Sequence, residues 1–122
     1  MKFYEVVFIV RSDASSSHVE ALAGGFVSIV RELGGEVTKT EFCGLRHLSY
    51  PIKKNKRGHY VLLNVTSDSD GVAELERRLR LDEDVIRSLI TRVDKLDNNP
   101  SALMRKNFRD VQSRDVQSKE QA

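Results

Sequence analysis

The sequence predicts an α+β domain in which two helices cover one face of a four-stranded antiparallel sheet. Short segments rich in Val, Ile, Leu, Phe and Tyr alternate with segments whose apolar residues recur at helical spacing, in the order β-α-β-β-α-β. The 122 residues are enough for one hydrophobic core. A hydrophobic fraction of 39% and a charged fraction of 31% are typical of a small domain with much exposed surface.

Strands at residues 2–10 and 58–66 are predicted to occupy the centre of the sheet. In residues 2–10 both alternating sets of side chains are apolar, which is typical of a strand that is covered on both faces. Residues 36–50 form a longer strand whose alternation shifts near Gly44, where we expect a β-bulge. A turn with the sequence PIKKNKRG follows this strand, and residues 85–93 form the last strand.

The first helix is expected to begin at a capping box formed by Ser17 and Glu20 and to end before the glycine pair 34–35. The second helix places Leu75 and Leu79 on one apolar face. Two βα units that share one antiparallel sheet define the ferredoxin-like split β-α-β arrangement. This fold serves many unrelated activities and does not define a function by itself.

We predict one ferredoxin-like domain over residues 1–96 and a flexible C-terminal tail over residues 97–122. The tail is polar, and the sequence RDVQS occurs in it twice in tandem. Leu103, Met104 and Phe108 are apolar anchors with which part of the tail could become helical on a partner protein. A solvated tail is the favoured interpretation.

Composition also indicates the compartment. Cys43 is the single cysteine, so an internal disulfide is excluded and a reducing cytoplasm is the simplest setting. No segment approaches the roughly 18 apolar residues of a membrane span. The apolar start of the chain is interrupted by Glu5 and lacks a small-residue cleavage site, so we interpret it as a strand rather than a signal peptide.

Patterns that indicate catalysis or metal binding are absent from the sequence. His18, His47 and His59 do not pair with each other or with Cys43 at a spacing that would form a metal site or a catalytic dyad. The glycine-rich phosphate-binding patterns and C-x-x-C are missing. We therefore predict a protein that is not an enzyme and that uses no cofactor or metal.

The charged residues are segregated along the chain. Residues 42–67 contain no Asp or Glu, although the whole chain has 20 Lys and Arg against 18 Asp and Glu. The basic residues of this stretch are Arg46, Lys53, Lys54, Lys56 and Arg57. Residues 68–84 then carry seven acidic residues and three Arg. One interpretation is a lysine-rich turn that only keeps a sheet edge soluble.

Rings interleaved with these cations favour a second interpretation, which is contact with RNA. The rings belong to His47, Tyr50, His59 and Tyr60. In RNA binding, cations pair with phosphates and flat rings stack on unpaired bases. An RNA-recognition motif would carry stacking aromatics on its third strand, where this chain has His59, Val61 and Asn64. We therefore expect binding through the hairpin and the sheet edges.

Three segments resemble the bacterial small-subunit ribosomal protein S6 family: YEVVFIVR, GLRHLSYPIKKNKRGHYVLLNV and ELERRLRLDEDVIRSLI. The resemblance covers about residues 2–93 in the order of the family. It implies the ferredoxin-like fold, no catalysis, and a place in the small ribosomal subunit of the bacterial cytoplasm. It also implies binding to the central domain of small-subunit ribosomal RNA as a heterodimer with ribosomal protein S18.

The resemblance adds residues to the expected binding surface. His47 replaces a residue that is often Arg in the family, which would make its contact weaker or sensitive to pH. The expected RNA contacts are Lys2, Tyr4, Arg46, His47, Tyr50, Lys53, Lys54, Lys56, Arg57 and Arg87. The expected partner contacts are Tyr60, Leu103, Met104 and Phe108.

The alternative function is a non-catalytic protein-interaction or regulatory module that uses the exposed face of the sheet. In that case the basic hairpin contributes only solubility. Steep salt dependence of RNA binding would favour the ribosomal function, whereas self-association without affinity for RNA would favour the alternative.

Overall fold

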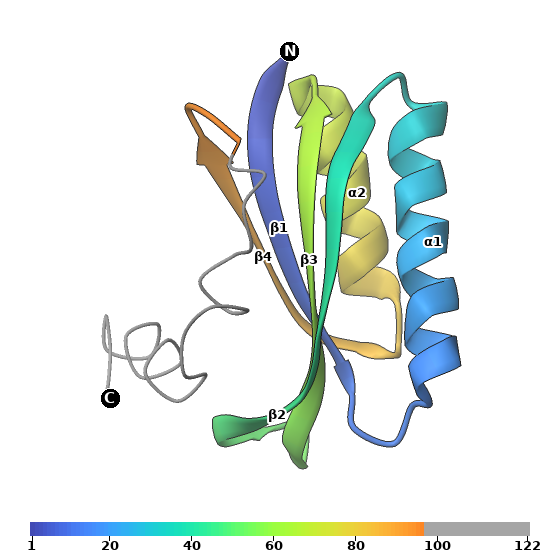
Figure 1. Ribbon diagram of the computed structural model, residues 1–122, viewed down its shortest axis with the longest axis vertical. Helices are drawn as coiled ribbons and strands as arrows, with labels where there is room; N and C mark the ends of the chain where they lie inside the picture. The colour runs from blue at the N-terminus through green and yellow to red at the C-terminus, as the bar shows by residue number, and fades with distance from the viewer. Residues whose placement is uncertain (97–122) are drawn as a thin grey trace.

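The computed structural model describes residues 1–96 of the chain, apart from the side chain of Ser49. In chain order the elements are β1 (Lys2–Arg11), α1 (Ser16–Glu32), β2 (Glu36–Ile52), β3 (Asn55–Ser67), α2 (Ser69–Leu81) and β4 (Val85–Val93). They form one antiparallel sheet in the order β2-β3-β1-β4, with both helices on one face (Figure 1). The predicted ferredoxin-like fold with two central strands is confirmed. The predicted tail lies outside the described residues, so the domain boundary stays a prediction.

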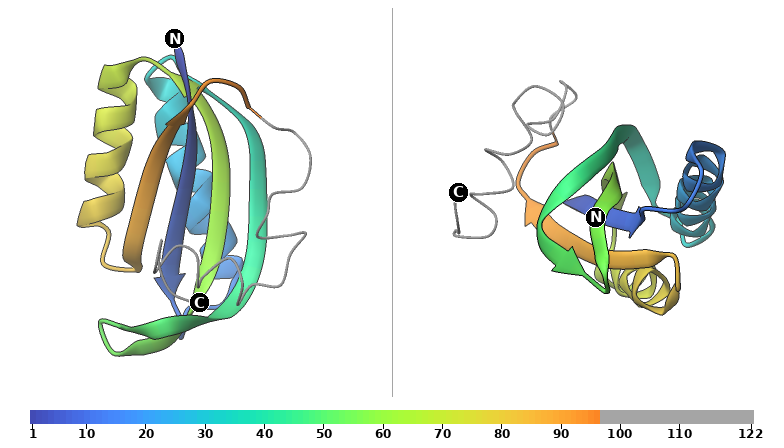
Figure 2. Two further views of the ribbon diagram at one scale, coloured as in Figure 1. Left: turned by 90° about the vertical axis from the view of Figure 1, so that its left-hand side faces the viewer. Right: turned by 90° about the horizontal axis from the view of Figure 1, so that it is seen from below.

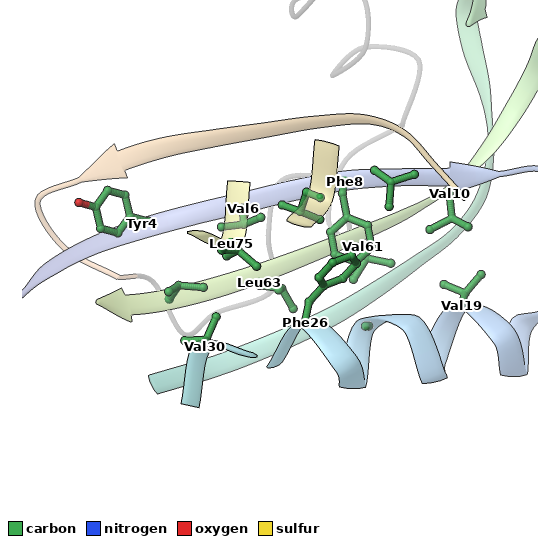
Figure 3. Packing of buried hydrophobic residues seen from close by; sticks show 14 of the residues in the cluster. Tyr4, Val6, Phe8, Val10, Val19, Phe26, Val30, Val61, Leu63 and Leu75 are labelled. Atoms are coloured by element: carbon green, nitrogen blue, oxygen red, sulfur yellow. The ribbon is translucent and has the colours of Figure 1, made fainter. Parts of the chain in front are cut away.

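The main core lies between the sheet and the two helices (Figure 3). The rings of Phe8 on β1 and Phe26 on α1 meet edge to face, with centroids 5.3 Å apart and an interplanar angle of 71°. Burying one such side chain stabilises the fold by about 1.5–3 kcal/mol. The largest fully buried side chains are Phe8, Leu63, Leu75, Leu79, Val6, Val10, Val61, Val65 and Asn64.

A second and smaller cluster packs on the other face of the sheet, here called the open face. Its buried members are Ile9, Cys43, Tyr60 and Ile86. Leu48 and Ile52, at the end of β2, pack against it. The hairpin of β2 and β3 accordingly bends away from the helices and across the end of the open face (Figures 1 and 2).

The helix ends depend on short polar side chains. Ser15 caps α1, because its Oγ accepts a hydrogen bond of 3.1 Å from the backbone N–H of His18. The predicted capping box at Ser17 and Glu20 is therefore wrong by two residues. Three consecutive serines are all competent caps, and the extended backbone falls at the first of them. The predicted glycine stop is confirmed, since Gly34 follows the last turn with φ 88°.

The strands of the hairpin are longer than predicted. β2 continues to Ile52 and β3 begins at Asn55, so the predicted eight-residue turn reduces to Lys53 and Lys54. The register shift predicted near Gly44 is confirmed, because the pairing of β2 with β3 slips between Phe42 and Gly44. The pairing also slips between Val37 and Lys39, and a slip between residues 47 and 52 leaves four residues of β2 outside the ladder.

Gly58 is predicted to be essential for the packing of the second cluster. A Cβ atom at this position would overlap the Cγ2 methyl of Ile9 and approach the carbonyl oxygen of Val10 to 3.3 Å. We expect Gly58→Ala to lower the free energy of unfolding by about 1–3 kcal/mol in urea titrations. Gly24→Ala is the matched control, because a Cβ atom there meets nothing within 4 Å. The substitution also removes a glycine from the middle of α1. The control should be more stable by about 0.5–1 kcal/mol. Equal urea midpoints for Gly58→Ala and the unmodified protein would contradict this account of the packing.

Candidate nucleic-acid interface

The tip of the hairpin carries four exposed cations. Lys53 and Lys54 form the turn, and Lys56 and Arg57 follow on β3; all four side chains are exposed. We call these four residues the basic turn. The hairpin extends beyond the rest of the sheet at the end opposite the N-terminus (Figure 1). The basic turn is therefore free of shielding by the helices.

The backbone of the turn is unusual for lysine. Ile52 pairs with Asn55, so the loop contains only two residues, and both have positive φ angles, 49° for Lys53 and 69° for Lys54. Two consecutive left-handed residues define the type I′ turn, which matches the twist of the strands and normally prefers Asn and Gly. Lysine at both positions keeps two charges at the tip at a cost in backbone energy.

The side chain of Asn55 supports this turn from the inside. Its Nδ2 donates hydrogen bonds to the carbonyl oxygens of Ile52, at 3.3 Å, and Lys53, at 3.1 Å. Its Oδ1 accepts from the backbone N–H of Ser12, at 3.1 Å, and from the Ser12 hydroxyl, at 3.0 Å. Asn55 therefore joins the turn to the loop between β1 and α1. Sequence analysis missed this residue, although asparagine in a turn is a known signal for side-chain bonds to the backbone.

The remaining expected RNA contacts are distributed around the hairpin base and the open face. Tyr50 is 52% exposed, and His47 is exposed opposite Arg57 in the ladder. Arg46 is half-buried, with its Nε donating to the carbonyl oxygen of Cys43 at 2.8 Å. Arg87 is exposed on β4. Arg46 and Arg87 thus flank the second cluster on either side of the central strands.

Two of the expected RNA contacts, Lys2 and Tyr4, do not join this surface, and neither does Tyr60, an expected partner contact. Lys2 pairs with Ser67 at the far end of β1, about 30 Å from the hairpin end of that strand. Tyr4 and Tyr60 are each only 8% exposed, in the main core and the second cluster respectively. Their rings are packed against other side chains and are not available for stacking on a base. The expected partner contacts at Leu103, Met104 and Phe108 lie outside the described residues.

His59 is half-buried. Its Nε2 atom is buried without a hydrogen-bond partner among residues 1–96. Within the same residues, no three His, Cys, Asp or Glu side chains gather in a group that could hold a metal ion. The described part of the chain also lacks any helix with the length and apolar character needed to cross a membrane.

A charged network fixes the loop to which Asn55 is bonded. Arg11 donates from Nε to Oδ1 of Asp84 at 2.6 Å and from its terminal nitrogen to Asp13 at 2.7 Å. The backbone N–H of Arg11 donates to the carbonyl oxygen of Asp84 at 2.9 Å. Nε2 of His18 lies 2.7 Å from Oδ2 of Asp84. The pKa of Asp84 lies below its ordinary value, mainly because of the hydrogen bond from Arg11 and secondly because of the contact with His18.

Comparison with known proteins gives the family. Residues 3–92 match the family model described as Ribosomal protein S6. The chain belongs to the ribosomal protein S6 family. This confirms the resemblance found in the sequence. The family consists of structural ribosomal proteins and is not known for catalysis, so the prediction that the chain is not an enzyme is also confirmed.

Relatives within the family are similar over most of this chain. "Small ribosomal subunit protein bS6" of Afipia carboxidovorans is 50% identical over 110 residues, which cover 90% of this chain and 76% of the relative. The protein of the same name from a Bradyrhizobium species is 52% identical over 110 residues, or 90% of this chain and 72% of the relative. The crystal structure of 30S ribosomal protein S6 from Thermotoga maritima matches with a TM-score of 0.72 and 29% identity. That match covers 75% of this chain and 87% of the T. maritima chain.

The charged network predicts a specific pH dependence of stability. The folded pKa of Asp84 is depressed from the ordinary value of 3.8, so its contribution is complete above that value and is lost as the pH falls through the folded pKa. We expect Asp84→Asn to lower the free energy of unfolding by about 1 kcal/mol at pH 7. The difference from the unmodified protein should shrink toward pH 2 in urea titrations. Glu83→Gln, at the exposed neighbouring position, is the control and should have little effect at either pH. A difference for Asp84→Asn that is equal at pH 7 and pH 2 would contradict the assignment.

Proposed function

We propose that this chain is a structural protein of the small ribosomal subunit in the bacterial cytoplasm, where it binds the central domain of small-subunit ribosomal RNA together with ribosomal protein S18. The observation that carries the proposal is the basic turn, in which Lys53, Lys54, Lys56 and Arg57 are exposed at the projecting end of a hairpin. Membership of the S6 family supports it, because curated relatives are named as small ribosomal subunit proteins.

Electrostatics support binding through this end of the molecule. Each cation placed against a phosphate releases condensed counterions, and this favours association at moderate salt. The acidic residues concentrate in a different segment, from Asp68 at the start of α2 to Asp84 before β4. Within α2 itself three acidic residues are balanced by three Arg, so this helix does not offset the positive charge segregated on the hairpin, and a nucleic acid would be attracted to the hairpin. Tyr50, beside the basic turn, offers an exposed ring for stacking on an unpaired base.

The open face supports the second part of the proposal, which is contact with a protein partner. Phe3 is 38% exposed and Leu89 is 58% exposed, and both lie on strands that border this face. In the ladder Leu89 is opposite Val7, so apolar side chains continue across β4 and β1. A partner that covers them would bury apolar area and leave the hairpin available for RNA. The formal net charge of this chain is only +2, so a basic partner would also strengthen binding to RNA.

Salt titration of RNA binding tests the proposed function. The probe is a fragment of the central domain of small-subunit ribosomal RNA, with and without ribosomal protein S18. We expect binding that depends on the partner and weakens steeply with salt. Neutralising Lys54 and Lys56 together should reduce the slope of log affinity against log salt by about 0.7–0.9 for each lysine that contacts a phosphate. Fluorescence anisotropy across salt concentrations measures the slope.

Arg80→Ala is the control, because this cation is exposed on α2 within the acidic segment. It should leave the slope unchanged. Absence of RNA binding with and without the partner would contradict the proposal. Self-association through the open face under the same conditions would favour the alternative, a protein-interaction module whose basic turn serves solubility.

A further inference from the structure

We propose that Asn55 is a positioning residue that holds the basic turn in the shape required for RNA contact. The proposal rests on the function proposed above and adds to it a residue that does not itself touch RNA. Asn55 is half-buried, whereas its neighbours Lys54 and Lys56 are exposed. Its role is to fix where those charges lie.

The carboxamide of Asn55 uses its whole hydrogen-bonding capacity. A side-chain amide has two N–H donors and an oxygen with two lone pairs. Nδ2 donates to two carbonyl oxygens of the turn, and Oδ1 accepts two hydrogen bonds from Ser12. Rotating the amide by 180° would bring donor against donor at Ser12 and oxygen against oxygen at the turn. The side chain therefore fits in one orientation, and the bonds couple two segments that are 43 residues apart.

The backbone of the turn needs the support that these hydrogen bonds give. Lys53 and Lys54 both occupy the left-handed region, which non-glycine residues disfavour. An Asn-Gly pair would adopt this turn readily but would remove both charges from the tip. This chain keeps the charges at the loop positions and places the asparagine immediately after them. Asn55 then stabilises the turn by bonding the carbonyl oxygens of Ile52 and Lys53.

Ser12, to which Asn55 is bonded, is itself held in place. Ser12 follows Arg11, which is bonded to Asp84 through its backbone and its side chain. Asp84 directly precedes β4, the strand that carries Arg87. The bonds thus connect the basic turn to the end of the sheet where Arg87 lies, and they set the spacing of two parts of the proposed RNA surface. A surface organised before binding loses less entropy when it binds.

The test combines RNA affinity with amide hydrogen exchange of the free protein. Asn55→Ala leaves every cation in place, so charge is matched. We expect about three- to tenfold lower affinity for the central-domain RNA fragment with S18, with the salt slope retained. In the free protein, the amide of Ser12 should lose protection from exchange, while amides of the central strands, such as Val6 and Val61, keep theirs.

A second substitution checks that Asn55 acts through the conformation of the turn. Lys54→Gly removes one left-handed lysine and lets the turn form more easily. If Asn55 works by stabilising the turn, Asn55→Ala should cost less affinity in the Lys54→Gly background than in the unmodified protein. An equal loss in both backgrounds would overturn the positioning role.

The outcomes separate this inference from the proposed function. Absence of RNA binding by the unmodified protein would defeat the proposed function, and the role of Asn55 toward RNA with it. Strong RNA binding that Asn55→Ala leaves unchanged would overturn this inference alone. Unchanged protection of the Ser12 amide would overturn the hydrogen-bonded link between Ser12 and Asn55.

If Asn55→Ala also loses protection in the central strands, Ser12→Ala is the variant to measure, because it removes only the hydrogen bond of one hydroxyl. That variant should bind about twofold more weakly, and equal binding would overturn the inference.

Discussion

The position of the hairpin depends on one constraint, which is that the central strands are apolar on both faces. Helices α1 and α2 cover the face that carries Phe8 and Leu63. Ile9 and Tyr60 point to the other face, and the hydrophobic effect favours covering them as well. Leu48 and Ile52 cover them because the hairpin bends over the end of the open face. The projection of the basic turn is thus a consequence of core packing.

The chain separates the residues that carry charge from those that hold the shape of the surface. Lys53 and Lys54 occupy the tip with exposed side chains, and the neutral amide of Asn55 bonds the backbone beneath them. The acidic residue Asp84 is paired with Arg11 and lies in contact with His18. This arrangement allows a nearly balanced protein to present one region of positive charge. It also explains why net charge is a poor guide to nucleic-acid binding here.

The sequence predicts the elements well because hydrophobic periodicity survives in each of them, and β4 matches the expected residues 85–93. The same periodicity predicts that Tyr4 is buried, since Tyr4 belongs to the alternating set of Val6 and Phe8. The resemblance to the S6 family instead placed Tyr4 among the expected RNA contacts. The bond between Asn55 and Ser12 was not predictable, because it depends on how a bent hairpin meets a distant loop. Local patterns identify charged residues, whereas tertiary packing decides which of them share a surface.

The most direct test of the account is lysine reactivity with and without RNA. An amine-selective reagent is applied to the protein alone, to its complex with S18, and to the complex with the central-domain RNA fragment, and mass spectrometry measures modification at each lysine. The account predicts that Lys53, Lys54 and Lys56 lose reactivity only when RNA is present, while Lys2, at the opposite end of β1, keeps its reactivity. Equal modification of the turn lysines with and without bound RNA would contradict the central claim.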